Sequence, residues 1–479
     1  MKRPSFIKNI FLRFVLTLPV NLKGIIVLPL LTRLYTQDIY GAWLQIVLIK
    51  EVFVVLLSLR LETALVRYLS KEQNPEEIIK AVFTVAAACS LCFICFIYFF
   101  QDEASRLIFG KQGFSSLLVV ASFWIVINAG MQIGLAVLRS QERIATLSIR
   151  EVLSALWLVG AVSFAYLMDL SIQRVIWICI TGDTILLVWI LFQIGVPFPI
   201  TSFLKSVADV RKFLPYSLPL IFNSLFLWFT ASIDRLIIVH LIGLASVGVY
   251  GVSLQVTLLL TVVLSPITFV LFPRVSASWN LKNKDDVNLF FSQAVSLTLI
   301  LSAPAIVGLL VVSPGLIALL AGQSYSTSSN LILFLLLAGL AKAIYQNHIF
   351  VIHLVEKTFL LPILFISTAV INYALCYFFV LKFGIEGAAI ARFITFGIMA
   401  FIVTIWGRKY VKFSIPWRIT FKVAIASIAM GIFISWMPVD TWFQLLTVVI
   451  IGGLVFLLLL FIFRVLTFEK LAALKRQLT

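Results

Sequence analysis

The chain has 479 residues, of which 62 % are hydrophobic and 12 % are charged, and its mean hydropathy is +1.11. A soluble protein is roughly half apolar and about a quarter charged, so this composition excludes a soluble protein. Lys and Arg number 37 against 20 Asp and Glu. The placement of these basic residues explains most of the excess without a nucleic-acid partner.

Apolar runs of about 20 residues, enough for a helix to cross some 30 Å of hydrocarbon, recur along the whole chain. The pattern predicts an all-α integral membrane protein with about fourteen transmembrane helices. We place them at 11–31, 40–59, 80–100, 115–138, 149–168, 174–196, 215–238, 247–272, 288–312, 330–354, 358–381, 386–406, 419–437 and 441–463.

The amino-terminal run is expected to be the first span and not a cleaved signal. It begins MKRPSF, contains Arg13 and Lys23, and has no small-residue cleavage site. When the spans are numbered in order, most Lys and Arg fall in loops and tails on one side. The basic residues of the opposite loops are Arg33, Arg106, Lys111, Arg174 and Lys382. By the positive-inside rule, we expect both termini in the cytoplasm.

The chain contains a long internal repeat. YGAWLQI at 40–46 returns as YGVSLQV at 250–256, and the fourth and tenth spans align at a similar shift, with Gln132 on Gln346. We expect residues 1–200 and 201–410 to be two parallel six-helix bundles, with two further transmembrane helices and a cytoplasmic tail in 411–479. Parallel repeats of this kind are typical of transporters with a central cavity between two bundles.

Ionisable side chains recur inside these apolar spans, where each charge costs about 2.5–3.5 kcal/mol on insertion scales. Such side chains should face protein or water, and helical spacing puts Asn128, Gln132 and Arg139 on one face. The residues expected to line a substrate-binding cavity are Arg13, Lys23, Lys50, Arg235, Lys342, Arg392, Asn128, Gln132 and Gln346. The candidates for energy coupling are Glu51, Asp183 and Asp234.

Several of these positions also have a simpler interpretation. Arg13 and Arg139 lie near span ends, where long basic side chains snorkel to the interface. Lys50 and Glu51 could form a buried structural pair, and Glu62 could lie in the loop after the second span. Neither the histidines nor the five cysteines have metal-ligand spacing, so no metal or other cofactor is expected.

Basic residues outnumber acidic ones in the buried polar set, which favours an anionic cargo. Arg can hold phosphate oxygens in bidentate fashion and Lys acts as a point charge, so a pyrophosphate headgroup would fit. The acidic candidates could pair with these charges or take up a proton. Coupling to protons, sodium or the membrane potential is therefore left open.

Two stretches resemble a known family. In FLPYSLPLIFNSLFLWFTASIDRLIIVHLIGLASVGVYG (213–251), Pro219, Asp234–Arg235 and Gly248–Tyr250 resemble the second-half signature of Wzx-like polysaccharide repeat-unit (O-antigen) flippases. These belong to the multidrug/oligosaccharidyl-lipid/polysaccharide exporter superfamily. LPLLTRLYTQDIYGAW (28–43) resembles that family's link between the first two spans. The likeness extends over about residues 10 to 410.

The resemblance implies a MATE-like fold and a flippase for undecaprenyl-pyrophosphate-linked oligosaccharide repeat units in the bacterial cytoplasmic membrane. The product would be O-antigen, capsule or another exopolysaccharide, and a polymerase and a chain-length regulator would be partners. Family positions important for transport correspond to Arg13, Lys23, Lys50, Asp234 and Arg235. The eighth span departs from the family because it carries no charge.

Three other functions compete with this interpretation. A cation-coupled multidrug exporter of the same superfamily would favour acidic residues in its cavity, and a lipid II flippase would share the fold and the headgroup. A membrane glycosyltransferase, polymerase or ligase would need a large external loop with catalytic residues. The longest outward loops, near 101–114 and 313–330, are short and poor in such residues, so an enzyme is not expected.

Overall fold

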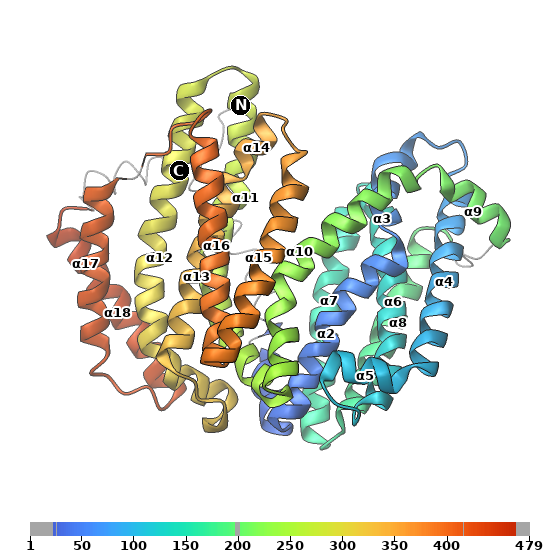
Figure 1. The fold of residues 1–479 in the computed structure, drawn as a ribbon, viewed down its shortest axis with the longest axis horizontal. Helices are drawn as coiled ribbons and strands as arrows, with labels where there is room; N and C mark the ends of the chain where they lie inside the picture. Colours follow the sequence, from blue (N-terminus) through green and yellow to red (C-terminus); the bar gives the residue numbers. More distant parts are fainter. Residues whose placement is uncertain (1–22, 25, 197–201, 415, 466–479) are drawn as a thin grey trace. The chain divides into compact units, whose positions relative to one another are not determined.

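The computed structural model describes residues 23–24, 26–196, 202–414 and 416–465. Within this part of the chain every regular element is helical. The first group of helices is α2 (Gln37–Ser58), α3 (Leu61–Tyr68), α4 (Pro75–Phe99), α5 (Gln101–Phe109), α6 (Ser115–Ser140), α7 (Ile144–Leu167), α8 (Ile172–Gln193), α9 (Phe203–Arg211) and α10 (Leu214–Leu241). The second is α11 (Leu244–Asn280), α12 (Lys284–Ala321), α13 (Ser329–His348), α14 (Phe350–Leu354), α15 (Leu360–Phe383), α16 (Ile385–Gly407), α17 (Trp417–Ile434) and α18 (Trp442–Ile462). Figure 1 shows them along the chain.

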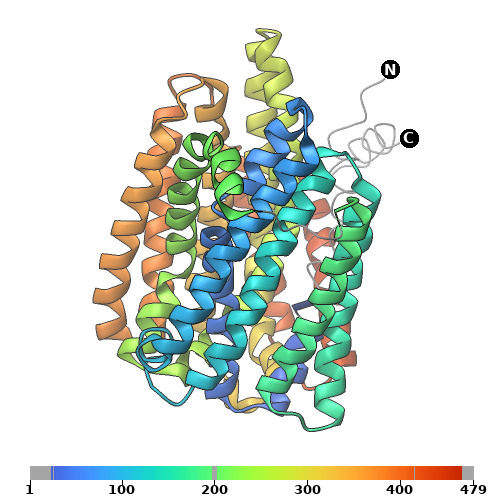
Figure 2. The same cartoon turned by 90° about the vertical axis from the view of Figure 1, so that its right-hand side faces the viewer.

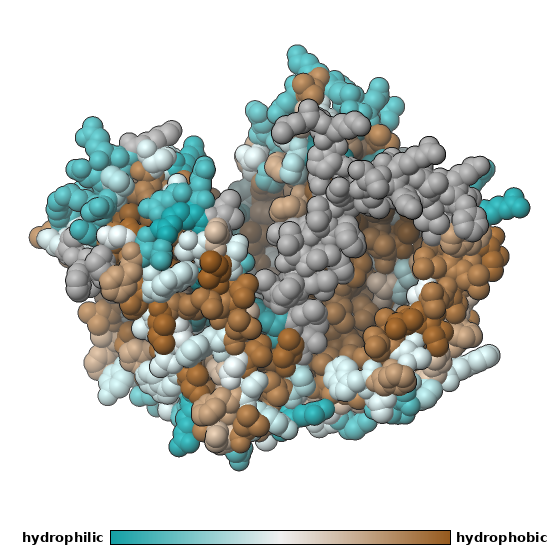
Figure 3. Space-filling model, turned by 180° about the vertical axis from the view of Figure 1, so that it is seen from behind, coloured by the Kyte–Doolittle hydropathy of each residue, from teal (hydrophilic) through white to brown (hydrophobic). Residues whose placement is uncertain are grey.

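The all-helical membrane fold is confirmed. In the described residues, thirteen helical segments are long and apolar enough to cross a membrane. The first expected span, 11–31, is helical in its described part, at 23–24 and 26–34, and Arg13 lies outside the described residues. Apolar side chains cover the middle of the helices and polar ones gather at their ends (Figure 3), as a bilayer requires.

Contacts between Cα atoms divide the chain into two compact units. The first is Leu30–Gly248, and the second combines the described residues up to Pro29 with those from Val249 onward. Helix α10 therefore packs with the first unit, through contacts with α2 and α3. The repeat boundary expected near residue 200 concerns sequence duplication, and it stays a prediction.

The first unit has an apolar core that α3, α4, α6 and α8 share. Leu61, Val82, Ala136 and Ile190 are all fully buried in it. Helix α6 contacts α2, α3, α4 and α8, so it is the central helix of this unit. Figure 2 turns the outer helices of the unit, from α4 in blue to α8 in green, toward the viewer.

The second unit is built on two sets of contacts. Helix α13 packs against α16, which packs in turn against α15, and α12 packs against α13 and α17. Helix α18 lies against α17 and α12. A capping box fixes the start of α18, because Thr441 accepts from the Gln444 backbone and Gln444 accepts from the Thr441 backbone.

Candidate functional site

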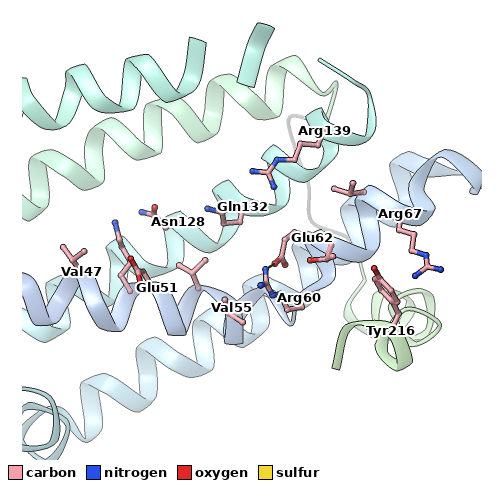
Figure 4. A pocket seen from close by; sticks show the side chains of 14 residues that line it. Val47, Glu51, Val55, Arg60, Glu62, Arg67, Asn128, Gln132, Arg139 and Tyr216 are labelled. Carbon is pink, nitrogen blue, oxygen red and sulfur yellow. Dashed lines mark hydrogen bonds and ion pairs between the residues drawn. The ribbon is translucent and has the colours of Figure 1, made fainter. Parts of the chain in front are cut away.

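A cavity of about 800 Å³ lies within the Leu30–Gly248 unit (Figure 4). This volume is within the usual range of small-molecule sites. Helices α2, α3, α6 and α10 supply its wall. The lining residues are Val47, Lys50, Glu51, Val54, Val55, Arg60, Glu62, Thr63, Val66, Arg67, Asn128, Gln132, Arg139 and Tyr216.

Helical spacing places the lining residues of α2 and α6. On α2, Val47, Glu51 and Val55 recur every four residues and therefore share one face. On α6, Asn128 and Gln132 do the same. Figure 4 shows these two polar and apolar stripes facing one another across the cavity.

A break between α2 and α3 brings further charged residues to the cavity. Leu59 and Arg60 have φ values of 50° and 56°, which is the left-handed region that side chains with a Cβ rarely adopt. Each such residue costs on the order of 1–3 kcal/mol, and this kind of strain clusters at functional sites. Because the chain turns here and then resumes as α3, Glu62 and Arg67 line the same cavity as Glu51.

Arg60 is held in place by partners on two elements. Its Nε and Nη2 atoms both donate to Oγ of Ser224 on α10, over 2.8 and 2.6 Å, and its Nη1 donates to Oε1 of Glu62 over 3.1 Å. Oε2 of Glu62 is buried and accepts no hydrogen bond from the described residues. The Arg60 side chain is 33 % exposed, so a cavity ligand can reach it.

Lys50 and Asp183 lie on opposite sides of one indole ring. Nζ of Lys50 is 3.7 Å from the centroid of the Trp124 ring, and Nε1 of Trp124 donates to Oδ2 of Asp183 over 2.8 Å. Asn128, which lines the cavity, donates to the same oxygen over 3.0 Å. A cation above the face of an indole is attracted by its quadrupole, so the carboxylate and the cavity lysine are linked through Trp124.

Aromatic rings surround the basic residue at the α3 end of the cavity. The Arg67 guanidinium carbon is 4.7 Å from the ring centroid of Tyr216 and 5.2 Å from that of Tyr68. The two tyrosines themselves meet edge to face at 5.4 Å. This packing restricts the Arg67 side chain and presents a flat aromatic surface at the cavity wall.

The electrostatic character of the cavity is basic. Its charged lining residues are Lys50, Arg60, Arg67, Arg139, Glu51 and Glu62, so cations exceed anions by two. Phosphate groups suit such a lining, because arginine can donate two parallel hydrogen bonds to phosphate oxygens. The neutral polar residues Asn128, Gln132 and Thr63 add donors and acceptors for hydroxyl groups.

The structure brings some of the sequence-predicted site residues together in this unit. Lys50, Glu51, Asn128 and Gln132 line the cavity, and Asp183 adjoins it through its hydrogen bonds. Asp234 and Arg235 on α10 are not among the lining residues. Asp234 is 2 % exposed, and its Oδ1 accepts from the Arg235 backbone N–H over 2.9 Å.

The other predicted residues lie in the second unit or outside the described residues. Lys342 and Arg392 lie near each other there, since each is 5.8 Å from the centroid of the Phe396 ring. Lys23 is half-buried and Gln346 is exposed. Arg13 lies outside the described residues. The binding roles of all four described side chains stay predictions.

Sequence reasoning missed four residues of the cavity. Arg60, Arg67 and Tyr216 were not considered as site residues, and Glu62 was placed near a loop although it lies in α3. The helix break that positions them contains neither Gly nor Pro, so the usual sequence signals of a break are missing. The pattern of breakers would not have found it. Among the described residues, no group of three His, Cys, Asp or Glu side chains could hold a metal ion.

Comparisons with known proteins place the chain among transport-related proteins. The family model for polysaccharide biosynthesis proteins matches residues 30–330. The probable low-salt glycan biosynthesis flippase Agl15 of Haloferax volcanii is 23 % identical over 342 residues, covering 69 % of this chain and 70 % of the relative.

Solved structures match the fold over most of the chain. Lipid II flippase MurJ in an inward closed conformation matches with a TM-score of 0.76 and 17 % identity, covering 94 % of this chain and 98 % of MurJ. An inward-facing multidrug resistance MATE family transporter of the MOP superfamily matches with a TM-score of 0.63 and 15 % identity, covering 82 % of this chain and 94 % of the transporter. The expected MATE-like fold is confirmed.

Proposed function

The chain belongs to the polysaccharide biosynthesis protein family, and we propose that it is a flippase for undecaprenyl-pyrophosphate-linked oligosaccharide repeat units. It would move them from the cytoplasmic to the outer leaflet of the bacterial cytoplasmic membrane, for synthesis of O-antigen, capsule or another exopolysaccharide. A relative named as a glycan biosynthesis flippase supports the proposal.

The single observation that carries the proposal is the basic lining of the cavity in the Leu30–Gly248 unit. Lys50, Arg60, Arg67 and Arg139 line it against two carboxylates. A pyrophosphate headgroup at bilayer depth needs such partners, because a charge without them is costly in a medium of low dielectric constant. An exporter of organic cations would need the opposite sign.

The uncharged part of the lining suits the sugar portion of the cargo. Asn128, Gln132 and Thr63 can exchange hydrogen bonds with hydroxyl groups directly or through water. Tyr216 adds an aromatic face of the kind on which sugar rings stack. These contacts are permissive, so the same cavity accepts different repeat units.

Transport would proceed by alternating access, with each compact unit moving as a body. Asp183 would supply the coupling, because its hydrogen bonds to Trp124 and Asn128 link it to the cavity wall. Protonation of Asp183 would weaken the polarisation of Trp124 and release Lys50 for the cargo. Both termini would lie in the cytoplasm, and a polymerase and a chain-length regulator would receive the product.

A flipping assay tests this function. Purified protein is reconstituted into liposomes with a fluorescent undecaprenyl-pyrophosphate-linked oligosaccharide, and a membrane-impermeant quencher reports which leaflet holds the dye. We expect the protein to equilibrate the lipid between leaflets much faster than protein-free liposomes do. Equal rates with and without protein would reject the proposal.

Lipid II is the second candidate cargo, because its pyrophosphate would meet the same basic residues. The two cargoes are separated by supplying each one in parallel in the same assay. Faster movement of lipid II than of the oligosaccharide repeat unit would assign the chain to cell-wall precursor transport. We expect the repeat unit to be the better substrate.

A further inference from the structure

Arg60 connects the cavity to α10 through one hydroxyl group. Two parallel N–H groups of its guanidinium, Nε and Nη2, end on the single Oγ atom of Ser224, over 2.8 and 2.6 Å. Ser224 donates its own proton to the Leu220 carbonyl over 2.8 Å. The hydroxyl therefore accepts with both lone pairs, and a neutral group occupies the edge of Arg60 that best fits two phosphate oxygens.

The bond at Ser224 differs from the other side-chain bonds between α10 and α2. Nε1 of Trp228 donates to the Leu48 carbonyl over 2.9 Å, and Nε2 of Gln45 donates to the Arg235 carbonyl over 3.4 Å. Both of these end on backbone atoms of a helix. Only the bond at Ser224, among these three, uses a side chain that lines the cavity, so a cavity ligand can compete for it.

Helix α10 has a weak point next to this bond. Pro219 lies inside the helix, five residues before Ser224, and it removes one backbone hydrogen bond and favours a kink. The turn before Pro219 carries Tyr216, which lines the cavity and packs against Arg67. Both sides of the proline thus contact residues of the cavity wall.

We propose that Arg60 is a phosphate-operated latch on α10. The phosphate of the lipid headgroup takes the Nε–Nη2 edge of Arg60, displaces the Ser224 hydroxyl, and frees α10 to bend at Pro219. A charged phosphate wins this exchange, because hydrogen bonds to charged groups are stronger than those to a neutral hydroxyl. A neutral sugar or alcohol does not. The latch rests on the proposed flippase function and specifies how binding would start the conformational change.

The local structure supports a latch over a fixed structural contact. Glu62 contacts Arg60 through Nη1 alone, so the carboxylate orients the guanidinium and leaves the other edge to exchange. The left-handed backbone at Leu59 and Arg60 fixes where the side chain starts. Arg60 is therefore positioned before cargo arrives, which reduces the entropy lost on binding.

The test measures lipid binding and α10 movement in the same full-length protein. Spin labels are placed at Leu91→Cys on α4 and Phe222→Cys on α10, which are 64 % and 61 % exposed, after the five native cysteines are replaced by alanine. The protein in nanodiscs receives undecaprenyl pyrophosphate, inorganic pyrophosphate or undecaprenol. We expect the label distance to change with a pyrophosphate and not with undecaprenol. The pyrophosphate that binds more tightly identifies whether lipid-linked or free phosphate is the ligand.

Variants separate the latch from simple packing. Ser224→Ala should bind undecaprenyl pyrophosphate about threefold to tenfold more tightly, because the competing hydroxyl is gone, and should show the changed label distance without ligand. Arg60→Lys should bind about tenfold more weakly, since lysine is a point charge without a fork. Ser217→Ala is the matched control on the same helix: its hydroxyl is buried without a hydrogen-bond partner in the described residues, and wild-type binding and distances are expected.

Two results would overturn the latch and are distinct from failure of the function. If undecaprenyl pyrophosphate binds and the label distance stays fixed, α10 is not released, although the protein still binds its cargo. If Ser224→Ala lowers the melting temperature and leaves affinity unchanged, the bond to Arg60 is structural. Absence of any binding to wild-type protein would instead reject the flippase proposal itself.

Discussion

The indole N–H of Trp124 donates a hydrogen bond to Oδ2 of Asp183 over 2.8 Å. The same ring carries Nζ of the cavity residue Lys50, 3.7 Å from its centroid. A hydrogen bond to a carboxylate increases the electron density of the ring and so strengthens its attraction for the ammonium group. The charge of Asp183 is therefore felt at the cavity without direct contact between the two charged side chains through this ring.

This relationship predicts the behaviour of Asp183→Asn. The amide can still accept from Trp124, so the fold is preserved, but it carries no charge and cannot take up a proton. We expect flipping that no longer responds to an imposed pH gradient, measured in proteoliposomes with the fluorescent lipid. Trp124→Phe keeps the ring and removes the donor, and should reduce the response in part. An unchanged response in Asp183→Asn would show that coupling lies elsewhere.

Removal of cavity charges should reduce flipping. Lys50→Gln and Arg139→Gln each delete a cation of the lining, and the loss of a charge-assisted hydrogen bond corresponds to about tenfold to a hundredfold. The flipping rate at equal protein abundance is the measurement. Lys205→Gln is the control, because Lys205 pairs with Glu77 at 3.0 Å away from the cavity and is 59 % exposed. A rate loss as large in the control would mean that general surface charge is responsible.

A glycine in α8 should be sensitive to a single added methyl group. A Cβ at Gly182 would lie 2.0 Å from Nε1 of Trp157, whose N–H donates to the Ile178 carbonyl over 2.8 Å. Gly182→Ala must displace this indole, and overpacking of this kind costs about 1–3 kcal/mol. We expect a lower melting temperature in detergent.

The matched control for that substitution is Gly160→Ala on α7. A Cβ there meets no atom within 4 Å, and alanine favours the helix by up to about 1 kcal/mol. The melting temperature of this variant should equal or exceed that of the wild type. Equal melting temperatures for both variants would contradict the packing of Trp157 on Gly182.

Alkaline pH should destabilise the loop that contains Tyr35. Its hydroxyl donates to the Leu170 carbonyl over 2.6 Å, and burial, with a smaller effect from Asp169, raises the pKa of Tyr35 from 10.0 to about 12. The folded state thus binds the proton more tightly than the unfolded state. The stabilisation is complete below pH 10 and is lost as pH rises toward 12.

The free energy of unfolding, measured between pH 9 and pH 12, tests this prediction through Tyr35→Phe. The variant should be less stable at neutral pH because it lacks the hydrogen bond to Leu170. Its further loss of stability above pH 10 should be smaller than that of the wild type. A parallel fall in both proteins would assign the alkaline sensitivity to other groups.

The sequence was sufficient to predict the membrane helices, because apolar runs of the right length have few other structures open to them. Their ends were less predictable. Helix α12 extends over Lys284–Ala321, beyond the expected 288–312, since helical hydrogen bonding continues outside the apolar run. The break at Leu59–Arg60 was missed because its residues are ordinary helix formers in other contexts.

The candidate site was predictable only where one helix carried the information. Asn128 and Gln132 share a face by spacing alone, and they do line one cavity. Arg60 meets Ser224 across 164 positions of the chain, and Asp183 meets Trp124 across 59. Such pairs depend on tertiary packing, which spacing along one helix does not encode. The binding roles of the predicted residues stay predictions.

The central claim is that a pyrophosphate headgroup binds among the basic residues of the Leu30–Gly248 cavity. Photo-crosslinking with an undecaprenyl pyrophosphate that carries a diazirine beside the phosphates tests it most directly, with the labelled peptides identified by mass spectrometry. The account predicts labelling of α2, α3 and α6 around Lys50, Arg60 and Arg139, and its loss when unlabelled undecaprenyl pyrophosphate is added. Labelling confined to other helices, or unaffected by the competitor, would contradict it.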